Sequence, residues 1–489
     1  MSRQRIIGVS EAHFGQAEKD ALCRVIDSGW ISMGDEVARL ERAFAQAHGH
    51  EEGVAVSSCT AGLHLGLEAL GIGEGDEVLV PGLTFVATVN AVLYARAVPV
   101  PVDIVSLQTP HLSLEAARRL VTERTRAVIV MPYGGYALDM AAWAAFCKEH
   151  SLFLVTDAAH AAGLSGAAAY GDVTVFSFFA NKNMTTAEGG MILSGRPDVL
   201  AACRSLRGHA MTTQTLQRNR GHAYSYDVTG LGYNYRMDEL RAALGMVQLD
   251  RLERANARRR ELVAVYRSQL NRRLPDIQIP FTADHATAAH FMPIVLPQEA
   301  DRAQTMVSMR EAGVQTSIHY PPYHRFTWHS KLFAGVSLPL VDEYTERCLT
   351  LPLHVNMDEI DVNTVVAALA AALGPEQPAT WSPAQGTVDY HACLKEGFAA
   401  LEQGEPQQAR EHFRRVFDLA PHSDATRVGL ALAAQEQDAA GETLAAIWRV
   451  LETNPASVEA WDALARLQPD DPVLADVAQQ CAAALRKDA

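Results

Sequence analysis

The sequence predicts an α/β fold with a mainly parallel sheet, followed by a smaller α+β part and an all-helical repeat array. Three observations predict it. Between residues 50 and 195, short runs of Val, Ile and Leu alternate with helical segments. Mixed strand and helix patterns continue to about residue 373. Beyond a proline-containing stretch, only helical periodicity remains, and it repeats.

Seven strands are expected in the first part of the chain, because each is a nearly continuous apolar run that suits burial on both faces. Their ranges are 53–58, 77–82, 98–103, 127–132, 152–157, 173–178 and 190–195. Helical periodicity between them predicts helices at 60–72, 115–121 and 139–150. Helices that alternate with strands supply the crossovers that parallel strands need.

A long helical segment, 237–270, then leads into the smaller α+β part. There we expect a strand at 290–297 and helices at 300–313 and 362–374. The predicted domains are a large one at 1–250 and a small one at 251–373. The N-terminal segment is expected to join the small domain.

The last part of the chain carries an internal repeat. Residues 374–388 are expected to be a linker, because prolines and glycines replace the periodic pattern. After it, the segment 396–421 is echoed by 429–455, with their terminal prolines 34 residues apart. A helix–turn–helix repeat of this period is typical of tetratricopeptide arrays, so 389–489 is predicted to be such a domain.

Composition and charge exclude several classes of protein. The formal net charge is −15, from 42 Lys+Arg and 57 Asp+Glu, so the overall basic footprint of a nucleic-acid binder is absent. No apolar run reaches the roughly 18 residues of a membrane span, and no signal-peptide core is present. Seven cysteines without a C-x-x-C pair predict reduced thiols and no metal centre. We therefore expect a cytoplasmic protein.

Three chemical features fall at the ends of predicted strands. Asp157 ends the strand at 152–157, where open α/β sheets bind ligands, although a helix N-cap is the alternative. Lys182 lies between two asparagines in a loop, where a solvated lysine is the alternative. The segment VAVSSCTAGLHL passes directly from strand to helix, which suits a bound phosphate or a simple capped helix.

Together these groups favour pyridoxal phosphate (PLP) as the cofactor. PLP needs a lysine for its Schiff base, an acidic partner for its pyridine nitrogen and an anion site. Ser177, at a neighbouring strand end, adds a hydroxyl to the anion site. The chain has only six lysines beside 36 arginines, and only a primary amine such as that of Lys182 forms the imine.

Residues 5 to about 373 resemble the DegT/StrS-type sugar aminotransferases, which are PLP enzymes of the aspartate aminotransferase fold (fold type I). Five motifs carry the resemblance, in the order that the family has them. They are SSCTAGLHLGLEALGIGEGDEVLVPGLTFVATVNAV (57–92), TDAAHAAG (156–163), FSFFANKNMTTAEGGMI (176–192), GYNYRMDELRAALGMVQL (232–249) and SIHYPPYH (317–324). The chain departs from the family at Cys59, where Gly is more usual, and at Gly62, where Ala is more usual.

The resemblance implies a role for each matching residue. Lys182 carries the Schiff base, and Asp157 pairs with the pyridine nitrogen. The other implied cofactor contacts are the backbone N–H groups of Thr60 and Ala61 and the hydroxyl of Ser177 at the phosphate, the Phe85 ring on the cofactor ring, and His160 beside the cofactor's O3′. For Phe85 and His160, core packing is the alternative from the residues alone. Asn234 is implied to reach the phosphate in the neighbouring subunit, which means a homodimer with shared active sites.

Two further residues are expected to face substrate. Arg236 suits a donor carboxylate, and His324 suits a sugar or its diphosphate, although a surface ion pair and a packed histidine are the alternatives. The reaction implied is amino transfer from glutamate to a keto group of a nucleotide-linked sugar. Alternatives are a keto-cyclitol or other small ketone, sugar dehydration, and a PLP-fold scaffold acting through its repeats. Lys182 disfavours dehydration, since the family's dehydratases carry His there.

Overall fold

The structure is a computed structural model of the whole chain. It describes residues 6–213, 225–374, 395–400, 403 and 405–417, and the single positions 447, 460, 461, 463, 464 and 479. The chain divides into two compact units. The first comprises residues 1–357 and 365–373, and the second comprises 358–364 and 374–489.

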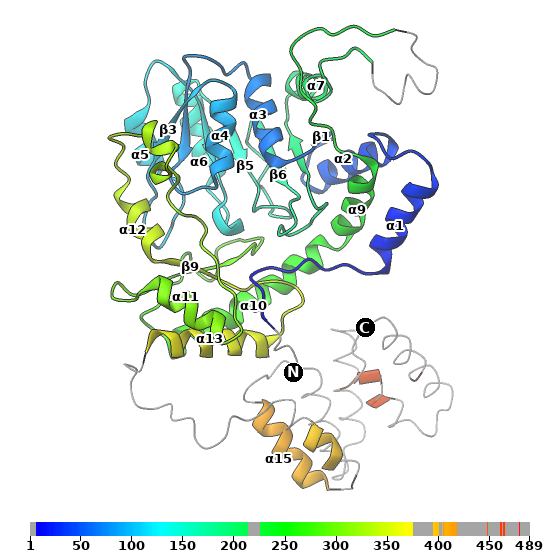
Figure 1. Cartoon of the computed structure of the whole chain (residues 1–489), viewed down its shortest axis with the longest axis vertical. Helices are drawn as coiled ribbons and strands as arrows, with labels where there is room; N and C mark the ends of the chain where they lie inside the picture. The colour runs from blue at the N-terminus through cyan, green and yellow to red at the C-terminus, as the bar shows by residue number, and fades with distance from the viewer. Residues whose placement is uncertain are drawn as a thin grey trace. The chain divides into compact units, whose positions relative to one another are not determined.

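The first unit is built around a seven-stranded sheet (Figure 1). The strands are β1 (Gly53–Val56), β2 (Glu77–Pro81), β3 (Val98–Val102), β4 (Thr125–Val130), β5 (Phe153–Asp157), β6 (Val173–Ser177) and β7 (Gly190–Leu193). Their order is β1-β7-β6-β5-β4-β2-β3. The strands β2 to β6 pair in parallel, and β7 is antiparallel to both of its neighbours. All seven predicted strands and the mainly parallel arrangement are confirmed.

Helices cover both faces of this sheet. The helices of the first part are α1 (Gln16–Asp27), α2 (Asp35–Ala47), α3 (Cys59–Ala69), α4 (Val86–Tyr94), α5 (Leu114–Leu120), η1 (Tyr133–Gly135), α6 (Met140–His150) and α7 (Pro197–Leu206). The predicted helices at 60–72, 115–121 and 139–150 are confirmed as α3, α5 and α6. Side chains alternate between the faces along each strand. One face packs on α3, α4 and α7, and the other packs on α2, α5 and α6.

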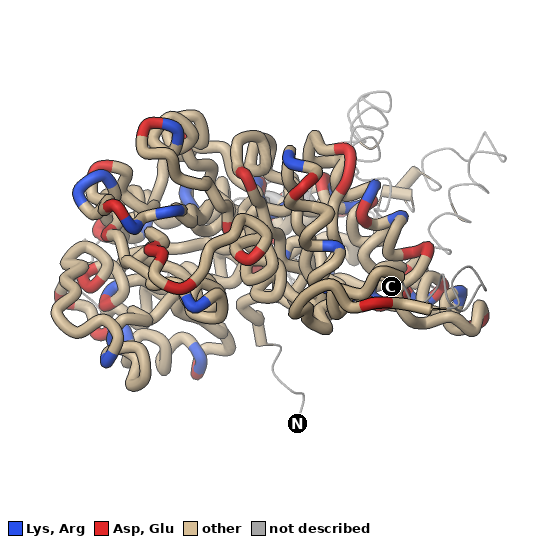
Figure 2. The backbone as a smooth tube through the Cα atoms, turned by 90° about the horizontal axis from the view of Figure 1, so that it is seen from above, with Lys and Arg blue, Asp and Glu red and all other residues tan. Residues whose placement is uncertain are grey.

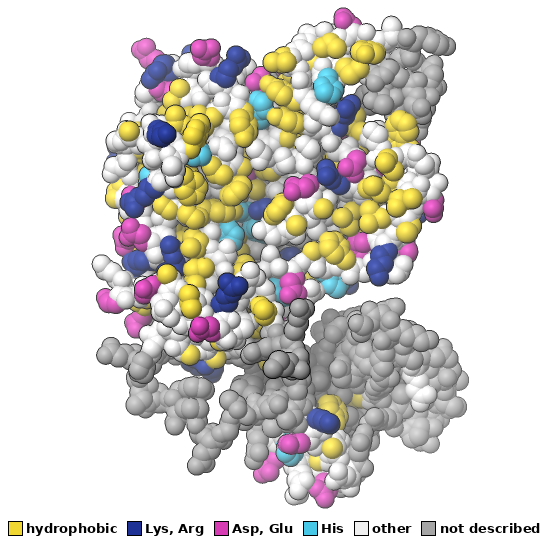
Figure 3. Space-filling model, in the orientation of Figure 1, with side chains coloured by type: hydrophobic (Ala, Val, Ile, Leu, Met, Phe, Trp, Pro, Cys, Tyr) yellow, Lys and Arg dark blue, Asp and Glu magenta, His cyan; other side chains and the backbone are white. Residues whose placement is uncertain are grey.

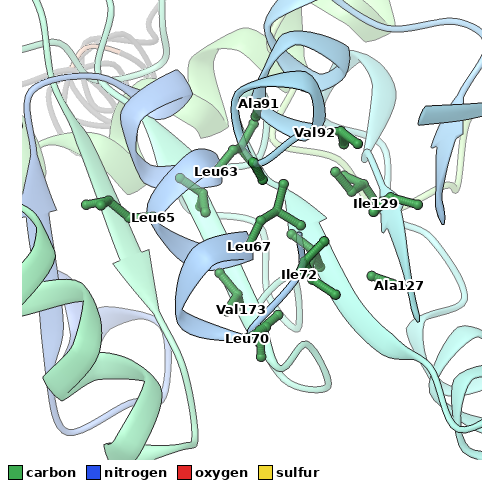
Figure 4. Packing of buried hydrophobic residues seen from close by; sticks show 14 of the residues in the cluster. Leu63, Leu65, Leu67, Leu70, Ile72, Ala91, Val92, Ala127, Ile129 and Val173 are labelled. Atoms are coloured by element: carbon green, nitrogen blue, oxygen red, sulfur yellow. The ribbon is translucent and has the colours of Figure 1, made fainter. Parts of the chain in front are cut away.

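Helix α3 lies close against the sheet, and this contact positions the start of the helix. Its apolar side chains pack with those of α4, β4 and β6 (Figure 4). A Cβ atom at Gly62 would lie 2.5 Å from Cγ1 of Val175, and one at Gly66 would lie 2.7 Å from Cγ1 of Val173. The two glycines therefore allow the approach that brings the helix N-terminus to the end of β6.

A second, two-stranded sheet pairs β8 (Met292–Val295) with β9 (Cys348–Leu351) in antiparallel register. The predicted strand at 290–297 is confirmed as β8, whereas β9 was not predicted. Between residues 302 and 373 the helices are α11 (Arg302–Glu311), η2 (Tyr323–Arg325), η3 (His329–Lys331), α12 (Pro339–Arg347) and α13 (Glu359–Leu373). Near the N-terminus, Ile7 pairs with Val314 in a parallel bridge.

The prediction of one continuous helix at 237–270 is wrong. The segment forms α9 (Glu239–Asp250) and α10 (Leu252–Arg273), which are separated at Arg251. The backbone of Arg251 leaves helical geometry with φ −101° and ψ 1°. Its guanidinium pairs with the buried carboxylate of Glu18 at 2.8 Å, and Leu252 is buried in the core beneath α2. Side-chain contacts across the break therefore compensate for the interrupted helix.

In the second unit, residues 395–400 are helical and are followed by α15 (Pro406–Phe417). Phe398 and Phe413 meet edge to face at 5.0 Å, with Ala400 and Ala409 buried beside them. A contact of this kind between the helical segment 395–400 and α15 is typical of a helical hairpin. Apart from Gly374, the predicted linker at 374–388 lies outside the described residues, as does most of the repeat array, which stays a prediction.

The charges of the described chain are mixed in sign. Figure 2 shows basic and acidic residues interspersed along the backbone, a pattern typical of a solvated protein surface. Among the helices that the structure describes, none is both long enough and apolar enough to cross a bilayer.

Candidate active site

A cavity of about 530 Å³ opens at the carboxyl ends of the central strands. Asp157 is the last residue of β5 and Ser177 the last of β6, so both side chains reach this edge of the sheet. The start of α3 and the segment 317–321 also line the cavity. In the space-filling view, histidine side chains lie near the middle of the molecular face among hydrophobic atoms (Figure 3).

Asp157 accepts two hydrogen bonds from oxygen and nitrogen donors in the cavity. Its Oδ2 accepts a hydrogen bond from the Thr88 hydroxyl at 2.6 Å, and its Oδ1 accepts one from the Ala159 N–H at 3.1 Å. Burial raises the pKa of this carboxyl, and the two hydrogen bonds and the charge of Lys182 oppose the rise. Residues 158–168 form turns instead of a helix, so Asp157 is not a helix N-cap.

Lys182 directs its amine into the same cavity. Its Nζ lies 3.4 Å from Nε2 of His290. Desolvation lowers the pKa of the amine to about 8, against the opposing effects of Cys59 and Asp157. A lysine with this pKa holds a substantial fraction of neutral amine near neutral pH, as a nucleophile or base requires. The interpretation as a solvated loop lysine is therefore wrong.

The start of α3 forms the expected anion site in part. Thr60 and Ser177 both line the cavity. The Ala61 N–H donates instead to the Ser58 hydroxyl at 3.1 Å, which caps the helix. In this arrangement the backbone N–H of Ala61 is engaged within the chain, and its predicted contact with a phosphate stays a prediction.

Cys59 occupies the position where the resembling family more often has glycine. Its side chain is buried, and its Sγ lies 3.8 Å from Oδ1 of Asp157 and 3.7 Å from the Val175 carbonyl oxygen. Burial and the nearby carboxylate raise the pKa of the thiol well above its usual value. Cys59 is therefore a protonated, weak donor toward Asp157.

An aromatic group forms one wall of the cavity. Phe85 lines it with a ring that is 54% exposed, and the ring centroid lies 5.5 Å from that of Tyr320. The Tyr320 hydroxyl lies 2.8 Å from Nε2 of His160. Burial and the charge of Lys182 hold the pKa of His160 well below its usual value, so its ring is neutral. An exposed aromatic ring inside a cavity is suited to stack on a planar ligand.

Three predicted residues, Asn234, Arg236 and His324, do not line the cavity of this chain. Asn234 is exposed, and its Oδ1 accepts a hydrogen bond from Nη2 of Arg236 at 3.0 Å, in a segment that bridges to Val56 of β1. His324 is buried in η2, where its Nε2 lies 3.0 Å from Oδ1 of Asp342. In this structure His324 is therefore a packed histidine, which was the alternative to its role at the substrate.

The residues of the cavity fit PLP. Lys182 supplies a primary amine. Thr60 at the N-terminus of α3 and Ser177 at the end of β6 line a place that favours an anion. A pyridinium nitrogen would give the buried Asp157 carboxylate a cationic partner in addition to Lys182. The exposed ring of Phe85 offers a stacking surface. Sequence reasoning did not find Thr88, Tyr320 or His290, although Thr88 and Tyr320 lie inside two of the quoted motifs.

The sheet, the lysine and the aspartate define a PLP-dependent enzyme of fold type I. The chain belongs to the DegT/DnrJ/EryC1/StrS aminotransferase family, which it matches over residues 13–370. It is a PLP-dependent aminotransferase.

Named relatives share most of this length. The Bacillus subtilis (strain 168) spore coat polysaccharide biosynthesis protein SpsC is 34% identical over 381 residues, which is 75% of this chain and 97% of SpsC. The sugar aminotransferase CalS13 from Micromonospora echinospora is 26% identical, with a TM-score of 0.68 over 75% of this chain and all of CalS13 (100%). NtdA from Bacillus subtilis, solved with bound cofactor PMP, is 27% identical, with a TM-score of 0.67 over 73% of this chain and 81% of NtdA.

The Thr88 hydroxyl is expected to keep Asp157 ionised. Thr88→Val removes the donor at 2.6 Å, so the pKa of Asp157 rises further and the carboxylate is lost at a higher pH as the pH falls. A hydrogen bond to a charged group contributes about 1.5–3 kcal/mol, which corresponds to a shift of about one to two pH units. The pH below which kcat/KM and the affinity for PLP decline (the acid limb of each profile) should rise by that amount.

Thr156→Val is the matched control for this change. Thr156 is a buried threonine beside Asp157, and its hydroxyl has no hydrogen-bond partner among the described residues. The control should leave the acid limb in place. Equal acid limbs in Thr88→Val and in the wild type would contradict the role given to Thr88.

Proposed function

We propose that this aminotransferase transfers an amino group from glutamate to a keto group of a nucleotide-linked sugar, in amino-sugar, polysaccharide or glycoconjugate biosynthesis. The observation that carries the proposal is the meeting of Lys182 and Asp157 in one cavity, in a chain of this family. The names of SpsC and CalS13 support a sugar acceptor. We also propose a cytoplasmic location, because Cys59, Cys147, Cys203 and Cys348 are buried free thiols.

The rim of the cavity suits a polar ring compound. Phe179 and Phe326 line it with rings that are 45% and 38% exposed. Asn181 and Glu188 line it beside them, and both are exposed. Aromatic faces pack on the C–H surface of a sugar ring, while amide and carboxylate oxygens accept hydrogen bonds from its hydroxyls.

Each cavity residue has a distinct task in this proposal. PLP, when bound, supplies an electron sink for the bond-breaking at the amino-bearing carbon. The Asp157 carboxylate, which the Thr88 hydroxyl keeps ionised, would keep a proton on the pyridine nitrogen. Ser177 would hold the phosphate through its hydroxyl and Thr60 through its backbone N–H, and Phe85 would stack on the ring. The freed amine of Lys182 removes a proton from one carbon and delivers it to another.

The amino donor and the acceptor are tested with the purified full-length chain. With glutamate, the visible absorbance band of the bound cofactor should be lost, and a nucleotide-linked keto-sugar should restore it. Keto-cyclitols and keto-sugars without a nucleotide are the competing acceptors in the same screen. Restoration by a cyclitol, with no response to any nucleotide-linked sugar, would overturn the proposed acceptor.

Lys182→Ala provides the control for this assay. The variant should lack the visible band after dialysis, because no primary amine remains at the cofactor. Lys148→Ala, at the end of α6, should keep both the band and the turnover. A band that persists in Lys182→Ala would refute the assignment of this lysine.

We propose a homodimer in which Asn234 serves the active site of the partner subunit. Asn234 and Arg236 support this, because neither lines the cavity of its own chain and they bond to each other. In a mixed dimer of Lys182→Ala and Asn234→Ala, one of the two sites then keeps both residues. Mixing the two inactive variants should therefore restore about a quarter of wild-type activity, since half of randomly mixed dimers are hybrid.

Mixing Lys182→Ala with Ser177→Ala is the matched control. Ser177 lines the same cavity as Lys182, so every site of that hybrid carries a substitution and no activity should return. Equal, low activity in both mixtures would show that Asn234 does not act in the neighbouring subunit.

We propose that residues 389–489 form a tetratricopeptide-like array that binds a basic, extended segment of a partner protein. This span has 17 acidic and 9 basic residues, which suits such a segment. Removing residues 375–489 should leave kcat and the dimer unchanged but abolish salt-sensitive binding of an Arg-rich peptide. Peptide binding that survives the deletion would contradict the proposal, and a loss of the dimer would instead indicate a stabilising role.

A further inference from the structure

His290 contacts the amine of Lys182 but has no task in the reaction described above. It lies just before β8, is buried, and places its Nε2 3.4 Å from Nζ of Lys182. Its ring stacks on that of His160, with centroids 4.6 Å apart. Its ring does not line the cavity, but its Nε2 reaches the lysine amine from the buried side.

The tautomer of His290 is determined by Asn183. The Asn183 Nδ2 donates to the Ala288 carbonyl at 2.7 Å, and a carbonyl only accepts. The amide orientation is thereby set, and Asn183 Oδ1 faces Nδ1 of His290 at 2.8 Å. His290 must therefore carry its proton on Nδ1, which leaves a lone pair on Nε2 facing Lys182.

A second amide from α10 reinforces this orientation. Asn256 donates from Nδ2 to the Ala162 carbonyl at 2.9 Å, so its Oδ1 is the acceptor for Nδ2 of Asn183 at 2.8 Å. Both asparagines are buried, with Asn256 fully inaccessible (0% exposed). Two main-chain carbonyls therefore set the direction of every hydrogen bond from α10 to Lys182.

The protonation state of His290 agrees with this direction. Burial and the positive charges of Lys182 and Arg259 hold the pKa of His290 well below its usual value, so the ring stays neutral and Nε2 stays an acceptor. The other titratable groups that face Lys182 or line its cavity are Asp157, Cys59, His160, His319, Tyr320 and Glu188. The histidines among them bond elsewhere, His319 to Thr350 and His160 to Tyr320.

We propose that His290 is a positioning residue that accepts a hydrogen bond from the freed amine of Lys182 and aligns it in the cavity between proton transfers. This rests on the proposed function only in that Lys182 is the amine that moves the proton. No covalent bond changes, and the proton stays on Nζ until it is delivered to the substrate carbon. Without His290, the charged form of the amine loses an acceptor and its pKa falls.

The low lysine content of the chain makes the pKa of Lys182 directly measurable. The full-length protein without cofactor, labelled with ¹³C at lysine Cε, should give signals from only six lysines, and Lys182→Arg identifies the signal of Lys182. In His290→Phe, the titration midpoint of Lys182 should fall by about one pH unit, from the loss of one charged hydrogen bond. Asn183→Leu should lower it by a smaller amount, because the histidine tautomer is then no longer determined.

Two further variants separate positioning from general stability. His290→Gln retains an acceptor and should recover most of the midpoint. His111→Gln alters another buried histidine, one that packs on Phe281, and should leave the midpoint unchanged. If His290→Phe does not fold, the Lys182 midpoint of Asn183→Leu is compared with that of His290→Gln.

An unchanged Lys182 midpoint in folded His290→Phe, or in Asn183→Leu where His290→Phe does not fold, would overturn the proposal. In the PLP-loaded enzyme, kcat should fall at least about tenfold in His290→Phe, with KM for the donor little changed. The lysine titration needs no substrate, so an error in the proposed acceptor leaves it unaffected. Failure of the two proposals is therefore distinguishable.

Discussion

The burial of a carboxylate and an amine in one cavity is the constraint on which the rest of this site depends. Asp157 and Lys182 each lose hydration there, and desolvation moves their pKa values toward the neutral forms. Each charge partly restores the ionised form of the other. The hydrogen bond from Thr88 adds to this effect on the aspartate side. The fold must therefore deliver donors and acceptors to both groups, and the packing around the cavity serves that requirement.

The position of α3 is the second condition of the site. Gly62 and Gly66 let the helix approach Val175 and Val173, so that its first turn reaches the edge where β6 ends. A Cβ atom at either glycine would clash with one of these valines, so the valine side chain or the helix that carries Thr60 would have to shift. The replacement of the more usual Gly by Cys59 fits the same packing, because its thiol lies in the space between Asp157 and β6.

Much of this organisation was predictable from the sequence. The seven strands are buried on both faces and therefore appear as apolar runs, and Asp157 and Ser177 follow from where two of those runs end. Lys182 followed from its chemistry and its motif. Contacts between distant segments were not predictable. Neither periodicity nor spacing shows that Thr88 reaches Asp157, or that the pairing of Arg251 with Glu18 accompanies a break between α9 and α10.

Asn183 and Asn256, which connect α10 to Lys182 through His290, show why contacts between distant segments matter to the chemistry. An amine with a pKa near 8 exchanges between its two protonation states with little cost, which suits a group that must both take and give a proton. The same property makes its orientation poorly defined unless a neighbour fixes it. A histidine of undetermined tautomer cannot do so, because an Nε2–H would repel the ammonium. The carbonyls of Ala162 and Ala288 remove that ambiguity through Asn256 and Asn183, and no charged group is needed to do so. Main-chain carbonyls are in this way connected through hydrogen bonds to the side chain that moves the proton.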